Sequence, residues 1–121
     1  MSKRILVVED QEDNRRIVRD LLTSVGYEIV EAITGEEGVS MAETHAPDLI
    51  LMDIQLPGMD GYEATRRIKA QAELRQIPII AVTSYALSGD DVKAFEAGCD
   101  AYVSKPFSPR ALLAKIRAFV P

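Results

Sequence analysis

Hydrophobic positions along this chain fall into five short runs, and stretches with a helical pattern of apolar and polar residues separate the runs. Most of the runs are almost wholly apolar and rich in Val, Ile and Leu, which is typical of strands buried on both faces of a parallel sheet. The pattern therefore predicts strands at residues 3–8, 27–32, 49–53, 77–82 and 101–103.

Capping and turn residues mark the helices between these strands. Thr34 followed by Glu37 is a capping-box pair, and Ser108 before Pro109 is typical of a helix start. The predicted helices cover residues 13–25, 34–45, 61–72, 88–97 and 109–120. The predicted apolar stripe of the first helix consists of Ile17, Val18, Leu21, Leu22 and Val25.

Strands that alternate with helices through short loops predict an α/β domain with a parallel sheet and right-handed crossovers. For a chain of 121 residues we expect one domain of the flavodoxin-like (βα)5 type, a three-layer sandwich with strand order 2-1-3-4-5. In this arrangement the carboxyl ends of all the strands lie on one rim of the sheet. Side chains that directly follow the strands should therefore meet there.

Composition excludes several classes of function. The net charge of -5 argues against nucleic-acid binding, which needs a basic surface. The only cysteine, Cys99, leaves no internal disulfide, and the only histidine, His45, makes zinc a poor candidate. No apolar run is long enough to cross a membrane, so we expect a cytoplasmic protein.

Charged and hydroxyl side chains follow four of the predicted strands. Glu9 and Asp10 follow the first strand, Asp53 ends the third, Thr83 follows the fourth and Lys105 comes just after the fifth. Each has an ordinary explanation by itself, as a turn, cap or surface residue. Five chemically matched residues at four strand ends are nevertheless an improbable coincidence, and they predict a functional site.

The predicted site suits phosphoryl transfer. Clustered carboxylates repel one another unless a cation compensates, and an all-oxygen cluster suits Mg²⁺. Asp53 could then act as a nucleophile towards phosphorus and form an aspartyl phosphate. Lys105 would supply further positive charge, and the Thr83 hydroxyl could donate to a phosphoryl oxygen.

These motifs resemble the receiver domains of two-component response regulators. The resemblance covers the whole chain, and four segments carry it: VVEDQEDN, LILMDIQLPGMDG, IIAVTSYA and GCDAYVSKPF. It implies that Glu9, Asp10 and Asp53 bind Mg²⁺ together with the backbone carbonyl of Gln55, and that Asp53 is also the phosphoacceptor.

The same resemblance implies roles for residues in and after the last two strands. Thr83 would be the switch hydroxyl and Tyr102 the switch aromatic residue, while Lys105 would contact the phosphoryl group and precede a cis peptide bond to Pro106. Gln55 and Tyr85 stand at the variable positions where the family tunes dephosphorylation, so the lifetime of the phosphoryl group stays open.

The family resemblance also implies partners. We expect residues 1–121 to be a receiver domain without an output domain, which accepts its phosphoryl group from a sensor histidine kinase or a histidine phosphotransfer protein. Its signal would leave through a downstream protein or by onward phosphorelay. The expected contact surface is formed by the helix at 88–97, the last strand and the helix at 109–120. No nucleic-acid or membrane partner is expected.

Three other functions are compatible with parts of the pattern. A Mg²⁺-dependent phosphatase would be a true enzyme, but such enzymes resemble one another in carrying the aspartyl nucleophile after the first strand. An FMN-binding electron carrier would need a hydroxyl- and glycine-rich loop where this chain has Glu9 and Asp10. A receiver that binds partners without phosphorylation would have no need of the matched residues. We therefore expect a phosphoacceptor that catalyses only its own phosphorylation and dephosphorylation.

Overall fold

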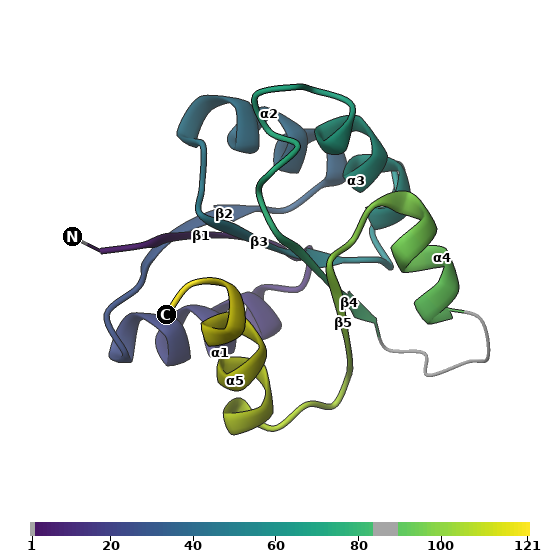
Figure 1. The fold of residues 1–121 in the computed structure, drawn as a ribbon. Coiled ribbons are helices and arrows are strands. Elements are labelled where there is room, and N and C mark those ends of the chain that lie inside the picture. The colour runs from purple at the N-terminus through teal and green to yellow at the C-terminus, as the bar shows by residue number, and fades with distance from the viewer. Residues whose placement is uncertain (1, 84–89) are drawn as a thin grey trace.

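The computed structural model describes residues 2–83 and 90–121, with the side chains of residues 90 and 91 outside the description. Within these residues, five strands alternate with five helices along the chain (Figure 1). The strands are β1 (Arg4–Val8), β2 (Glu28–Ala32), β3 (Leu49–Asp53), β4 (Ile79–Thr83) and β5 (Ala101–Ser104). The helices are α1 (Glu12–Ser24), α2 (Gly35–His45), α3 (Gly61–Lys69), α4 (Asp90–Ala97) and α5 (Pro109–Phe119).

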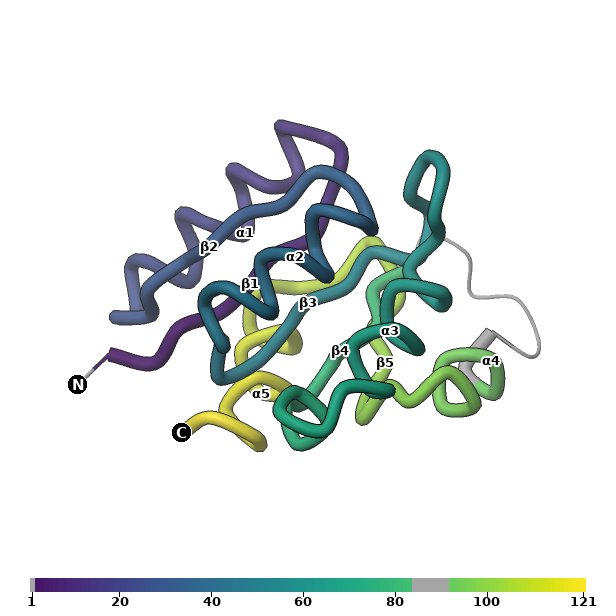
Figure 2. Tube along the Cα trace, turned by 90° about the horizontal axis from the view of Figure 1, so that it is seen from above, coloured from purple at the N-terminus to yellow at the C-terminus, as the bar shows by residue number. Residues whose placement is uncertain are grey.

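The strands form one parallel sheet in the order β2-β1-β3-β4-β5, which confirms the predicted flavodoxin-like topology. Figure 2 shows the strands side by side in this order, with β2 and β5 at the two edges. In the register of the central strands, Val8 pairs with Met52 and Asp53 pairs with Val82. The carboxyl ends of β1, β3 and β4 are therefore level, and the residues after them share one rim.

Helices cover both faces of the sheet and form two apolar layers with it. Helices α2, α3 and α4 lie on one face and α1 and α5 on the other (Figure 1). Because side chains alternate along a strand, Leu6 and Ile50 pack in the first layer, while Val7 and Leu51 pack in the second. Burial of the central strands on both faces explains why they are apolar without interruption.

Most of the predicted helix ends are confirmed. The backbone N–H of Glu37 donates to Thr34 Oγ1 at 3.0 Å, and that of Ala111 donates to Ser108 Oγ at 3.0 Å. Gly26 follows α1 with a φ of 97°, a conformation that favours glycine. The predicted start of the fourth helix at Ser88 lies outside the described residues.

Two details of the prediction are wrong. Ile17 and Val25, which we placed in the apolar stripe of α1, are 60% and 39% exposed, because the buried face of that helix is centred on Val18 and Leu22, with Leu21 packed beside them. Helix α3 ends at Lys69, earlier than predicted, because the chain turns there and Leu74 packs back into the core.

A close approach of the backbone fixes the loop that follows β3. The N–H of Gly61 donates to the carbonyl of Ile54 at 3.1 Å. A Cβ atom at Gly61 would overlap the carbonyl oxygen of Asp53 and lie 2.8 Å from Ile54 Cα. Only glycine therefore allows the start of α3 to pack against the end of β3, where Asp53 is held.

We predict that Gly61→Ala lowers the free energy of unfolding by about 2 kcal/mol or more, because the backbone must move to admit the methyl group. Gly58→Ala in the same loop is the matched control: Gly58 has a φ of 73°, and a Cβ atom added there would have no neighbour within 4 Å. Its cost should be about 1 kcal/mol, from backbone strain alone. Urea denaturation measures both, and equal losses would contradict the steric explanation.

Candidate functional site

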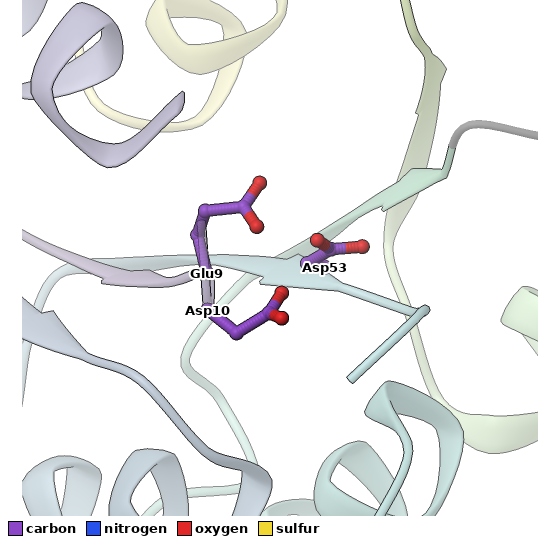
Figure 3. Close-up of side chains that lie close together, drawn as sticks. All are labelled: Glu9, Asp10 and Asp53. Carbon is purple, nitrogen blue, oxygen red and sulfur yellow. The ribbon is translucent and has the colours of Figure 1, made fainter. Parts of the chain in front are cut away.

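Three carboxylates from two strand ends converge on the rim of the sheet. Oxygens of Glu9, Asp10 and Asp53 all lie within 4.8 Å of one another. Figure 3 shows the carboxyl groups of Glu9 and Asp10, which follow β1, above and below that of Asp53 at the end of β3. Glu9 and Asp53 are 5% and 4% exposed, so their charges are largely removed from water.

Lys105 brings positive charge to this cluster from the loop after β5. Its Nζ atom donates to Glu9 Oε1 at 2.6 Å and to Asp53 Oδ2 at 3.3 Å. The predicted cis peptide bond between Lys105 and Pro106 is present. The structure thus brings together the predicted acidic residues and the predicted lysine.

Arg15 also supports the acidic loop, although its sequence position shows no sign of this. From the first part of α1, its Nη1 atom donates to the carbonyl of Glu9 at 3.0 Å, and its Nε atom forms a 3.2 Å ion pair with Glu31. The N–H of Gln11 donates to Glu9 Oε2 at 3.1 Å. These bonds fix the loop from which two of the three carboxylates project.

Gln55 connects Asp53 with Thr83 on the neighbouring strand. Its backbone N–H donates to Asp53 Oδ1 at 3.0 Å, and its side-chain Nε2 donates to Thr83 Oγ1 at 2.7 Å. From the sequence we expected Gln55 to bind the metal ion through its backbone carbonyl and to tune dephosphorylation, and nothing in the local pattern pointed to this side-chain contact with Thr83. Tyr102 is half-buried in β5 and packs against the core layer on the α2–α4 face, whereas Tyr85 lies outside the described residues.

Burial and charge alter the ionisation of these groups. Burial and the neighbouring Glu9 carboxylate raise the pKa of Asp53 to about 7, and Lys105 only partly offsets them. Burial acts in the same direction on Glu9, but hydrogen bonds with Asp53 and Lys105 outweigh it and lower the pKa of Glu9. Burial tends to lower the pKa of Lys105, yet its two acidic partners raise it. The site therefore holds more negative charge than Lys105 can balance.

A cavity of about 500 Å³ opens beside these side chains. Glu9, Asp53 and Lys105 form part of its wall, and Val7 and Leu51 contribute apolar surface from the sheet. Ile17 of α1, which is unexpectedly exposed, also lines it. The cavity leaves space beside the buried carboxylate of Asp53.

The cluster fits Mg²⁺ by its chemistry. Its side-chain ligands would all be carboxylate oxygens, which hard cations prefer, and their proximity is unfavourable without a cation. Cys99 offers no competing thiolate, because it is buried on another part of the fold and burial raises its pKa to about 11. Among the described residues, these three are the acidic cluster that could hold a metal ion.

Comparison with known families and proteins agrees with the geometry. The model of the response regulator receiver domain family matches residues 5–117. The chain is 44% identical over 120 residues to the polar-differentiation response regulator DivK of Brucella ovis, covering 99% of this chain and 98% of that protein. The chain therefore belongs to the response regulator receiver domain family, whose members are signalling domains of two-component systems.

Solved structures give the same result. The receiver domain of sensor histidine kinase PA1611 from Pseudomonas aeruginosa PAO1, with a magnesium ion coordinated in its active site cleft, is 39% identical and superposes with a TM-score of 0.92, covering 99% of this chain and 98% of that chain. The Vibrio cholerae chemotaxis protein CheY4 is 26% identical with a TM-score of 0.93, covering 98% and 99%. Family membership excludes the phosphatase and electron-carrier alternatives.

None of the helices among the described residues is long and apolar enough to span a membrane.

The raised pKa of Asp53 predicts how stability depends on pH in metal-free buffer. Between its ordinary value of 3.8 and the folded value of about 7, the folded protein binds more protons at Asp53 than the unfolded chain does. The free energy of unfolding should therefore fall as pH rises through this range. Glu9, whose pKa is lowered, gives the opposite pH dependence of stability, and this dependence is confined to pH values below its ordinary pKa of 4.5.

Asp53→Asn removes this contribution, so the variant should gain stability relative to the wild type by about 1 kcal/mol or more between about pH 5 and pH 8. Urea denaturation in the presence of a chelator measures the difference at each pH. Parallel profiles for the two proteins would show that burial and Glu9 do not perturb Asp53.

Proposed function

We propose that this receiver domain accepts a phosphoryl group on Asp53 from a partner histidine kinase or histidine phosphotransfer protein, with Mg²⁺ as cofactor. The observation that carries this proposal is the grouping of three carboxylates within 4.8 Å together with the contacts of Lys105 to Glu9 and Asp53. This grouping supplies a carboxylate nucleophile, an acidic cluster that favours a divalent cation, and an ammonium group that can balance charge on a phosphoryl group.

The residues of the chain have separate tasks in the transfer. An Asp53 oxygen forms the new bond to phosphorus as the bond between phosphorus and the histidine nitrogen of the donor breaks. The N–H of Gln55 and the Nζ of Lys105 contact the two oxygens of Asp53 and hold the carboxylate in one orientation. Lys105 also lies where it can balance charge on the phosphoryl oxygens.

Glu9, Asp10 and Asp53 would hold Mg²⁺ with the backbone carbonyl of Gln55. When bound, the metal ion supplies positive charge that stabilises the transferring phosphoryl group. The magnesium ion in the PA1611 receiver domain supports this assignment. The same residues would serve hydrolysis of the aspartyl phosphate, with Gln55 and Tyr85 setting its rate, so the domain would catalyse only its own phosphorylation and dephosphorylation.

The signal would leave through a surface formed by α4, β5 and α5, which we call the output face. A phosphoryl group adds charge and acceptor oxygens beside the Thr83 hydroxyl, and Thr83 would turn towards them. Tyr102, half-buried on the adjacent strand, would then move inward. A downstream protein or the next phosphorelay component would distinguish the two states by this face.

Asp53 should be the only residue that takes up phosphate. Incubation with a small phosphodonor and Mg²⁺ should add one phosphoryl mass to the wild type, measured by intact-mass spectrometry, and none without Mg²⁺. Asp53→Asn should abolish the addition, because Asp53 is the one carboxylate of the described cluster that lies on a buried strand tip and contacts Lys105. Asp60→Asn is the control, since Asp60 is an exposed cap of α3 and asparagine caps equally well. Full labelling of Asp53→Asn would refute the assignment.

The output face should respond to phosphorylation. Addition of beryllofluoride, a phosphate mimic, with Mg²⁺ should change the backbone NMR shifts of α4, β5 and α5 as well as those of the loops around Asp53. The strand β2, on the far edge of the sheet, provides the internal control and should change little. Changes confined to the loops at Asp53 would argue against this output face.

A further inference from the structure

The side chain of Gln55 holds the Thr83 hydroxyl before any phosphoryl group arrives. The Nε2–Oγ1 distance is 2.7 Å, and Thr83 is fully buried at the end of β4. The backbone of Gln55 is itself bound to Asp53 Oδ1 at 3.0 Å. One residue therefore connects the phosphoacceptor carboxylate with the hydroxyl that is expected to respond to it.

Hydrogen bonds to neighbouring strand ends hold the backbone of Thr83. Its carbonyl accepts a hydrogen bond from the N–H of Lys105 at 2.6 Å, and the carbonyl of Val82 accepts one from Ile54 at 2.9 Å. Both bonds belong to the ends of neighbouring strands. The Thr83 oxygen can change direction mainly by rotation about the Cα–Cβ bond, which in a β-branched residue switches between discrete positions.

This rotation affects the contact with Gln55. Turning Oγ1 towards a phosphoryl group on Asp53 takes it away from Gln55 Nε2, since the methyl group or hydrogen of Thr83 then replaces the oxygen. The two hydrogen bonds of Thr83 thus compete. A hydrogen bond that exists in only one of two states shifts the equilibrium towards that state.

We infer that Gln55 is a positioning residue: its side-chain amide holds Thr83 in the unphosphorylated orientation and thereby sets how readily the site accepts a phosphoryl group. This inference rests on the proposed function, because it assumes that Thr83 turns towards the phosphoryl group. It goes beyond any effect of Gln55 on dephosphorylation, because it concerns the equilibrium between the two orientations and involves no attacking water.

The test is the equilibrium affinity of the full chain for beryllofluoride at saturating Mg²⁺, which is measured from the change in amide NMR shifts. Gln55→Met keeps the backbone carbonyl and nearly the same side-chain length but removes the donor. It should bind the mimic about three- to tenfold more tightly, as expected for loss of one neutral hydrogen bond from the unbound state. Gln55→Asn, whose amide is one methylene too short, should behave in the same way.

Two further comparisons separate positioning from a general structural effect. Thr83→Val should weaken binding, and adding Gln55→Met to it should cause no further change, because the contact is already absent. Gln76→Met makes the same chemical change at an exposed site before β4, away from the rim, and should bind as the wild type does. Melting curves of each variant report whether it is folded.

The outcomes are distinct. Tighter binding by Gln55→Met that disappears in the Thr83→Val background supports the inference. Provided that the wild type binds the mimic, two results overturn the inference. One is unchanged or weaker binding by Gln55→Met, and the other is an equal gain in affinity in the wild-type and Thr83→Val backgrounds. Failure of the wild-type protein to bind beryllofluoride with Mg²⁺ would instead overturn the proposed function on which the inference rests.

Discussion

The ion pairs of Lys105 with two buried carboxylates determine the balance of charge in this site. Glu9 and Asp53 come from different strands and would repel each other, and the ammonium group of Lys105 bridges them from a third. Burial and the neighbouring Glu9 carboxylate raise the pKa of Asp53, and the single positive charge of Lys105 only partly offsets them. The remaining imbalance makes a divalent cation favourable at the rim.

The parallel sheet makes this arrangement possible. Its register places the ends of β1, β3 and β4 at one level, and the apolar layers on both faces hold the strands in position. The charged residues of the site occupy the last position of β3 and the loops beyond β1 and β5, so the charge imbalance at the rim does not disturb the core. A scaffold that is rigid in its strands can therefore support a site whose side chains change partners.

Much of the fold was predictable because the signals are local. The run that ends in Asp53 shows a buried strand by its composition alone, and Thr34 marks the start of a helix by its own hydrogen bond. The exposure of Ile17 was not predictable, because periodicity defines a helix face but not how far the sheet extends beneath it. The contact of Gln55 with Thr83, 28 residues away, depends on the packing of two strand ends and has no local signature.

The charge balance at the rim is tested most directly by the Mg²⁺ affinity of the unphosphorylated protein, measured by calorimetry. Lys105→Met removes the one ammonium group that contacts Glu9 and Asp53 among the described residues, while it keeps an unbranched side chain of similar length. Mg²⁺ should then bind at least about threefold more tightly, because the metal ion no longer shares the carboxylates with a competing cation. Unchanged or weaker Mg²⁺ binding by Lys105→Met would contradict a site in which Lys105 and the metal ion compensate the same negative charge.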